Sequence, residues 1–252
     1  MNKLRPFFIA IQFLTRIPTP KTEHISEDEI GHSTLFYPLV GLVIGLFLIS
    51  VAWVTGNNLD NNSNSFLSAA IILTAWVLVT GALHIDGLAD SADAWLGGNG
   101  DKERTLEIMK DPLSGPVAVT IIILLLLLKL TAIEAIISAG NYSLLLLAPV
   151  IARSYIPLLL LTTPYVRNNG LGSTMVEYLP SSKQIYSALG LVIIFSLFWA
   201  YSGFTAIIVS IITFFLIRKL MLKRINGTTG DTAGAMLEIM EATILIAIAL
   251  SF

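Results

Sequence analysis

The 252-residue chain has no cysteine and little charge. The absence of cysteine excludes disulfide bonds and thiolate metal sites. Charged residues make up 13% of the chain, well below the roughly 25% of a soluble globular domain. A net charge of −2 gives no basis for binding nucleic acid. With 55% hydrophobic residues and a mean hydropathy of +0.79, the composition indicates one integral membrane domain, residues 1–252, whose partner is the lipid bilayer.

Apolar runs long enough to cross roughly 30 Å of hydrocarbon recur along the chain. We therefore expect an all-α, polytopic membrane bundle with about seven spans, six and eight being the alternatives. The fifth and sixth spans are short, and the residues around 201–203 are either a tight turn between them or part of one broken span. The predicted spans are Leu35–Thr55, Phe66–Leu83, Pro116–Ile137, Ser143–Thr163, Ile185–Ala200, Phe204–Ile217 and Gly234–Leu250.

Residues 1–34 are expected to form a cytoplasmic or interfacial segment. Within it, the apolar run Phe7–Leu14 lies between Arg5 and Arg16 and is not followed by a cleavage site of small residues. This pattern favours a retained interfacial or partly inserted helix over a cleaved signal peptide.

The distribution of basic residues predicts the orientation. With a cytoplasmic N-terminus, thirteen of the fifteen Lys and Arg residues fall in four cytoplasmic segments, and the outer connections contain none. This is the positive-inside pattern. The other two, Lys129 and Arg153, lie within spans. The chemistry-bearing residues outside the spans are then on the cytoplasmic side.

An acidic segment, residues 84–115, is predicted to carry the active site. Leu83–Pro116 holds seven of the seventeen carboxylates. Asp86, Asp90 and Asp93 have the spacing i, i+4, i+7, which places them on one face of a helix. A hard cation such as Mg²⁺, bound through carboxylates, waters and a substrate phosphate, would offset their repulsion. His84 is a candidate base or phosphate contact.

The glycine-rich stretch that follows predicts a helix break and a second short helix. Gly97, Gly98 and Gly100 end the acidic helix, and a helix from Asp101 to Lys110 follows, with Asp101 as its N-cap. Lys110 is the cation nearest to the next membrane entry.

A second polar group is predicted to begin with Asp231 at another membrane boundary and to continue with Glu238 and Glu241 at increasing depth in the bilayer. Asp231, Glu238 and Glu241 can share one helical face, and an intramembrane carboxylate is a functional hypothesis by default. Arg153 lies mid-span and is expected to pair with Glu238 or Glu241. Lys129 and Glu134 are expected to extend towards the outer interface.

Motifs along most of the chain, from about Phe7 to Leu250, resemble those of the cobalamin synthase family. The motifs are "IQFLTRIPTP", "FYPLVGLVIG", "TGALHIDGLADSADAWLGG", "RTLEIMKDPLSGPVAV" and "GDTAGAMLEIMEA". The matching positions are His84, Asp86, Asp90, Asp93, Lys110, Asp111 and Asp231. The resemblance implies a Mg²⁺-dependent enzyme of the bacterial inner membrane. The implied substrates are adenosylcobinamide-GDP and α-ribazole or its 5′-phosphate, and GMP is released.

The resemblance also implies roles for these residues. Asp86 and Asp90 would hold Mg²⁺, and Asp93 would be a further ligand or the base. His84 is the other candidate for the base. Lys110, which we also count as catalytic, and Arg16 would contact phosphate. The further predicted substrate contacts are Arg153, Asp231 and Glu238.

Two other functions are compatible with the pattern of residues alone. One is a phospholipid synthase of the CDP-alcohol phosphotransferase type, and the other is a cation-coupled transporter with Arg153, Glu238 and Glu241 along its path. The one-sided concentration of carboxylates favours an enzyme. A homodimer that shares a cavity is a further hypothesis, because the chain is small relative to a corrinoid.

Overall fold

The computed structural model describes residues 4–20, 24–58 and 65–252. The regular structure of these residues is helical apart from one isolated bridge between Tyr165 and Thr228, which confirms the all-α prediction. Lys3, Lys21 and Glu23, which the sequence assigns to the cytoplasmic side, lie outside the described residues, as does most of the first outer loop.

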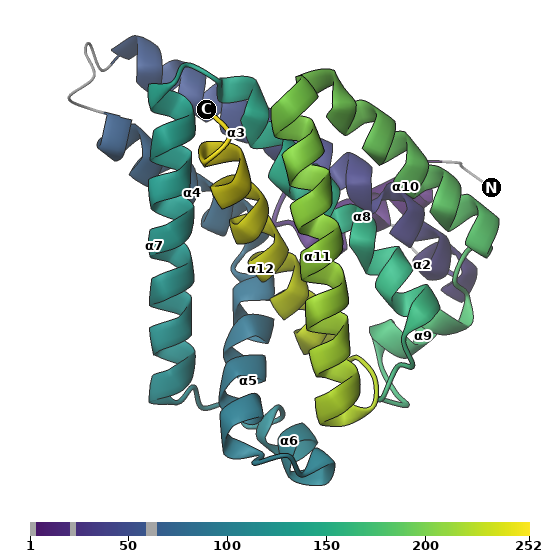
Figure 1. Cartoon of the computed structure of the whole chain (residues 1–252). Coiled ribbons are helices and arrows are strands. Elements are labelled where there is room, and N and C mark those ends of the chain that lie inside the picture. Colours follow the sequence, from purple (N-terminus) through teal and green to yellow (C-terminus); the bar gives the residue numbers. More distant parts are fainter. Residues whose placement is uncertain (1–3, 21–23, 59–64) are drawn as a thin grey trace.

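The helices form a bundle with a smaller projection at one end (Figure 1). In chain order they are α1 (Arg5–Leu14), α2 (Glu27–Ser33), η1 (Thr34–Phe36), α3 (Tyr37–Asn58), α4 (Ser65–Thr80), α5 (Leu83–Gly97), α6 (Lys102–Ile108), α7 (Pro116–Ser138), η3 (Tyr142–Leu146), α8 (Leu147–Thr162), α9 (Leu171–Glu177), α10 (Ser182–Ser196), η4 (Leu197–Trp199), α11 (Ala200–Ile225) and α12 (Gly230–Ala249).

Five helical stretches within the described residues are long and apolar enough to cross a membrane, and the bent pair α4 and α5 would make a sixth. One of the five, Ser182–Ile225, contains two helices, since α10 and α11 fold back on each other at η4 (Figure 1). The tight-turn alternative is therefore confirmed, with the turn at Leu197–Ala200, just before residues 201–203. The other four are Glu27–Gly56, Pro116–Ser138, Tyr142–Thr162 and Gly230–Ala249.

Helix α12 is the central element of the bundle. It packs against α5, α7, α8 and α11, and most of its residues are buried. Its first half is rich in small residues, which allow neighbouring helices to approach closely. Because α12 contacts so many helices, side chains at its start are placed relative to several parts of the chain at once.

A sharp bend separates α4 from α5 and places the acidic helix. The two helices meet at 88°, where the predicted second span was continuous to Leu83. Gly81 and Ala82 both have positive φ, at 64° and 57°, and such a conformation is uncommon for alanine. The N-terminal segment lies against the bend, since Arg16 N donates to Val79 O at 2.7 Å. A Cβ on Gly81 would come within 2.2 Å of Arg16 Nε.

The loop after α8 is joined to the turn before α12 by two backbone hydrogen bonds. Val166 N donates to Thr228 O at 2.9 Å, and Thr228 N donates to Pro164 O at 2.8 Å. Thr229 then caps α12 by accepting from Thr232 N. These contacts bring Arg167, on the loop, next to Asp231, in the first turn of α12.

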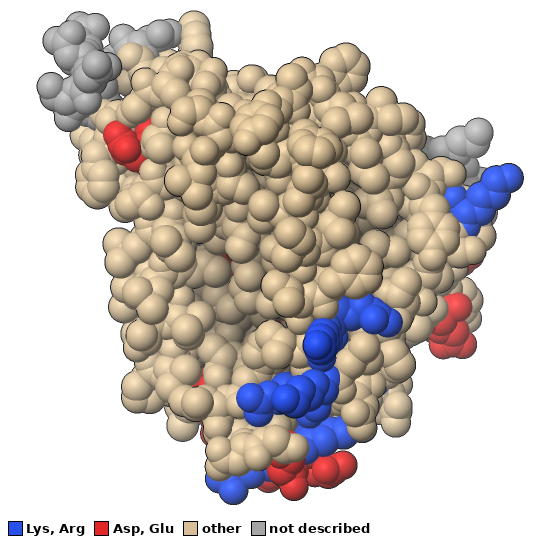
Figure 2. Space-filling view, in the orientation of Figure 1, with Lys and Arg blue, Asp and Glu red and all other residues tan. Residues whose placement is uncertain are grey.

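Charged side chains gather at one end of the molecule. Figure 2 shows Lys and Arg along the lower part of α11 and around α6, while most of the upper surface in this view is uncharged. The group on α11 consists of Arg218, Lys219, Lys223 and Arg224. The end that carries α5 and α6 is thus also the end rich in basic residues, as the positive-inside prediction requires.

Candidate active site

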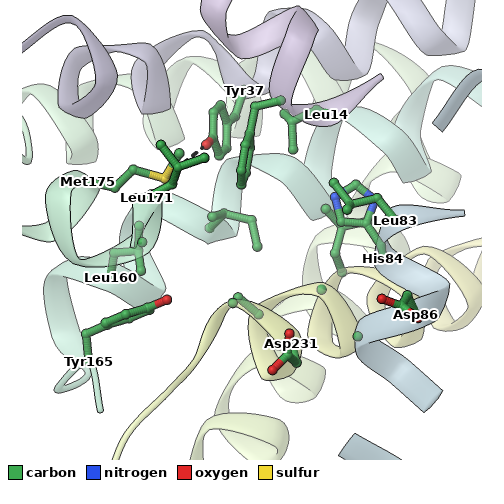
Figure 3. A pocket seen from close by; sticks show the side chains of 18 residues that line it. Leu14, Tyr37, Leu83, His84, Asp86, Leu160, Tyr165, Leu171, Met175 and Asp231 are labelled. Carbon is green, nitrogen blue, oxygen red and sulfur yellow. Dashed lines mark hydrogen bonds between the residues drawn. The ribbon is translucent and has the colours of Figure 1, made fainter. Parts of the chain in front are cut away.

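A cavity of about 260 Å³ lies between α1, α3, α5, α8, α9 and α12. Its wall is mostly apolar. Asp86 and Asp231 lie at one end of it, and Tyr165 and His84 lie on opposite sides (Figure 3). Tyr37 and Met175 border the other end, where the Tyr37 hydroxyl donates to Met175 Sδ at 3.5 Å. The cavity is thus apolar inside and acidic at one end.

Asp86 of α5 and Asp231 of α12 lie at the same end of the cavity because the two helices pack closely together at glycines. A Cβ on Gly87 would lie 2.7 Å from Asp231 O and 3.0 Å from Asp231 Cα, both backbone atoms. One turn earlier on α5, a Cβ on the facing Gly234 would meet His84 Cα at 3.4 Å. Only a residue without a side chain fits at Gly87, so this glycine sets how closely the aspartates of the two helices approach.

Four carboxylates influence one another at this end. Asp90 interacts electrostatically with Asp86, Asp231, Asp93 and the Arg167 guanidinium. Asp86 is exposed and Asp90 is partly buried, one helical turn apart. Arg167 Nη2 donates to Asp231 Oδ2 at 2.6 Å, with side chains 31% and 22% exposed. One guanidinium near several carboxylates leaves negative charge in excess, which suits a cation.

Asp93 has a different environment from the other aspartates of α5. Its Oδ2 accepts from Gly115 N at 2.5 Å and its Oδ1 accepts from Ala118 N at 3.0 Å. Both oxygens therefore bind N–H groups at the start of α7, the position where a helix leaves such groups unpaired. Asp93 acts in this structure as a cap of α7. The sequence pattern, which suggested a metal ligand or a base, does not reveal this contact.

His84 lies at the first turn of α5 and lines the cavity. Its side chain is 6% exposed, and its Nδ1 atom has no hydrogen-bond partner among the described residues. Buried polar atoms are rarely unpaired. The imidazole thus lines the cavity with one buried ring nitrogen that has no partner among the described residues.

Four charged side chains form a buried network deeper in the bundle. Lys129 Nζ lies 2.6 Å from both Glu238 Oε2 and Glu241 Oε2, and Arg153 Nη1 lies 2.6 Å from Glu241 Oε1. The predicted pairing of Arg153 with Glu238 or Glu241 is confirmed, and the partner is Glu241. The expectation that Lys129 extends to the outer interface is wrong, because its side chain is 3% exposed and lies over Trp76. Two cations and two anions neutralise each other there.

Comparisons with known proteins identify the family of this chain. Residues 6–249 match the cobalamin-5-phosphate synthase family. The chain belongs to this family. It is 50% identical to an adenosylcobinamide-GDP ribazoletransferase of Pseudomonas fluorescens, over 97% of this chain and 99% of the relative. It is 47% identical to the Pseudomonas aeruginosa enzyme of the same name, over 98% of both. No solved structure matches the chain.

Only some of the site residues that were predicted from the sequence of this cobalamin-5-phosphate synthase family member line the cavity. His84, Asp86 and Asp231 line it, and Asp90 lies beside them. Lys110 is exposed just beyond α6, and Arg16 is exposed beside the bend. Neither lines the cavity. The other predicted substrate contacts, Arg153 and Glu238, are 0% and 3% exposed within the buried network.

Two residues of the site were missed from the sequence. Arg167 was counted only as a basic residue of a cytoplasmic loop, and Tyr165, two positions earlier, drew no attention. Both depend on the pairing of the 164–166 strand-like segment with Thr228, a contact between distant parts of the chain. The signal available was weak: an Arg and a Tyr in a loop at the same membrane boundary as Asp231.

The residues at the acidic end are a suitable donor set for Mg²⁺. Within the described residues, no group of three or more His, Asp or Glu side chains is close enough to hold a metal alone. Mg²⁺ typically takes one or two carboxylates and completes its shell with waters and substrate phosphates. Asp86 and Asp90, half-open to solvent and one turn apart, fit that requirement.

Proposed function

We propose that this protein joins a corrinoid to its lower nucleotide. In this reaction, adenosylcobinamide-GDP reacts with α-ribazole or its 5′-phosphate to give adenosylcobalamin or its 5′-phosphate and GMP. The observation that carries the proposal is that Asp86 and Asp231 line one end of an apolar cavity and that both interact electrostatically with Asp90 beside it. The names of the Pseudomonas relatives support the same activity.

The bond changes balance without a further reactant. The 3′-oxygen of α-ribazole attacks the phosphorus on the corrinoid side of the diphosphate and forms a new P–O bond. The bond from that phosphorus to the bridging oxygen breaks, and GMP leaves with this oxygen. The hydroxyl proton passes to a base. Negative charge grows on the leaving phosphate, and groups placed to stabilise such charge supply much of catalysis.

We assign the metal to Asp86 and Asp90. When bound there, Mg²⁺ would offset the charge of the diphosphate and of the leaving GMP. Arg167 holds Asp231 in place through their ion pair, so that the third carboxylate stays at the mouth of the cavity. Lys110 and Arg16, exposed on the surface, are proposed contacts for phosphate groups that remain outside the cavity.

His84 is the proposed acceptor of the hydroxyl proton. Asp93, the other candidate, has both oxygens bound to the start of α7, whereas His84 lines the cavity beside Asp86. A general base must lie within hydrogen-bond reach of the proton that it removes. Because His84 lines the cavity, a hydroxyl bound there would lie on the side of this imidazole.

We place the protein in the bacterial inner membrane, with the acidic end in the cytoplasm. Relatives from Pseudomonas support a bacterial origin, and the basic residues near α6 and along lower α11 support the orientation. A homodimer stays a hypothesis.

The experiment is an assay of GMP release by the protein purified in detergent. Adenosylcobinamide-GDP, α-ribazole and Mg²⁺ should together give GMP and a corrinoid that carries the lower nucleotide. Omitting α-ribazole should stop GMP release. Activity with a CDP-activated lipid and an alcohol, and none with the corrinoid nucleotide, would overturn the proposal.

A further inference from the structure

We infer that the cavity is the binding site of the α-ribazole nucleoside, with its apolar base inside and its ribose at the acidic end. This inference rests on the proposed function and adds to it, because it assigns one of the two substrates to a defined part of the molecule. The other substrate, the corrinoid nucleotide, then approaches from outside.

The cavity is large enough for a nucleoside and too small for a corrin ring. A cavity of about 260 Å³ is near the lower limit of the roughly 300–1,000 Å³ of pockets that enclose drug-sized ligands. A corrin ring with its side chains is far larger than such a ligand, so the cavity cannot enclose it. A two-ring base with a ribose is a small ligand by the same measure.

The cavity is also apolar at one end and polar at the other. The inner wall is formed by apolar side chains, among them Leu14, Ile156, Leu160 and Leu237. Figure 3 shows Asp86, on α5, and Asp231, on α12, at the opposite end, with the Tyr165 hydroxyl on the side of the cavity across from Asp86. A ligand with an apolar base and a hydroxylated sugar is likewise apolar at one end and polar at the other. Apolar pockets with a few placed polar groups bind such ligands.

This orientation also places the reacting groups of the nucleoside beside the carboxylates. With the base inside, the ribose hydroxyls lie at the end lined by Asp86 and Asp231, and Asp86 is exposed. The diphosphate can therefore reach these carboxylates from the surface. The imidazole of His84 lies on the wall between base and acidic end, with its Nδ1 unpartnered among the described residues.

The test changes the size of the cavity at one residue. Leu160 is 6% exposed and lines the cavity, so Leu160→Phe should fill part of the space of the dimethylbenzimidazole base. We expect a rise of roughly tenfold or more in the KM for α-ribazole, by analogy with overpacked cores, and an unchanged KM for adenosylcobinamide-GDP. The nucleoside of benzimidazole, which lacks the two methyl groups, should be affected less. The neighbour Leu161 does not line the cavity, and Leu161→Phe is the matched control.

A second variant works in the opposite direction. Leu160→Ala enlarges the cavity and should allow the nucleoside of a three-ring naphthimidazole base to react, while the wild type reacts with it poorly. Binding of each nucleoside without the corrinoid, measured by equilibrium dialysis, should change in the same order. Thermal unfolding in detergent shows that each variant is folded.

The outcomes separate the inference from the proposed function. Absence of GMP release by the wild type would overturn the function. Normal wild-type turnover with a Leu160→Phe KM unchanged for α-ribazole, or raised for adenosylcobinamide-GDP as much as for α-ribazole, would overturn the inference alone. A cavity filled only by lipid predicts no change in either KM.

Discussion

At the scale of single residues, three aspartates of α5 with the same sequence signal have different surroundings. Asp86 and Asp90 lie at the acidic end with Asp231, whereas Asp93 holds two backbone N–H groups of α7. Helical spacing predicts which residues share a face. Helical spacing does not predict which aspartate contacts the start of another helix, because that contact depends on the loop between α5 and α7.

The Asp93 contact leads to a prediction about stability. Asp93→Asn keeps only one acceptor oxygen and turns an amide N–H₂ towards an N–H group, so α7 loses part of its cap. We expect a loss of about 1–2 kcal/mol of stability, seen as a lower midpoint of thermal unfolding in detergent. The Mg²⁺ concentration for half-maximal activity should not change.

Asp101→Asn is the control for this prediction. Asp101 caps α6 by accepting one hydrogen bond, from Arg104 N at 2.8 Å, as predicted from the sequence, and asparagine is an equally good N-cap. Its unfolding midpoint should stay the same. If Asp93→Asn left the midpoint unchanged and raised the Mg²⁺ requirement, Asp93 would be a metal ligand after all.

At the scale of elements, the contact between α5 and α12 determines the site. The sequence predicts both helices and their acidic residues, but their contact through Gly87 and Gly234 is long-range. Glycines within an apolar helix indicate close packing without naming the partner. The sharp bend at Gly81 and Ala82 was not predicted from the sequence, because alanine seldom adopts positive φ.

Gly87→Ala should separate α5 from α12. The new methyl group would lie 2.7 Å from a backbone oxygen, which cannot move without moving α12. Overpacking of this kind costs about 1–3 kcal/mol, and we expect at least roughly a tenfold loss of turnover because Asp86 and Asp231 move apart. Gly190→Ala, where a Cβ meets nothing within 4 Å, should leave turnover unchanged. Equal activity of the two variants would show that the spacing of the helices is unimportant.

The buried network of α7, α8 and α12 gives a second prediction at this scale. Lys129→Met leaves Glu238 and Glu241 with Arg153 alone, and breaking a buried ion pair costs about 3–5 kcal/mol. We expect a large fall in the thermal midpoint. Adding Glu238→Gln restores the balance of charge and should recover part of the loss. A double variant less stable than Lys129→Met would show that charge balance does not govern the network.

At the scale of the whole molecule, composition and hydropathy were enough to predict the all-α membrane fold, because apolar runs and basic loops are local signals. The exact membrane crossings could not be predicted from the sequence, because the bounds of short helices such as α4 and α10 depend on how these helices pack against the others. The lack of cysteine allows the orientation to be measured directly.

Single cysteines should report the two sides of the membrane. Glu103 in α6 and Asn141 before η3 are both exposed and lie at opposite ends of the bundle. In intact cells with a permeable outer membrane, an impermeant maleimide should label Asn141→Cys and not Glu103→Cys. In inverted vesicles the pattern should reverse. Labelling of Glu103→Cys from outside would place the acidic end on the wrong side.

The most direct measurement of the central claim is Mg²⁺-dependent GMP release by the wild type, Asp86→Asn, Asp90→Asn and Glu107→Gln. Wild-type release should stop with a chelator and return with Mg²⁺. Each of the two α5 variants should lose roughly a hundredfold or more in rate, the scale of removing one group that stabilises developing charge. Glu107→Gln, an exposed carboxylate of α6, should behave like the wild type. Wild-type rates in both Asp86→Asn and Asp90→Asn would contradict the account.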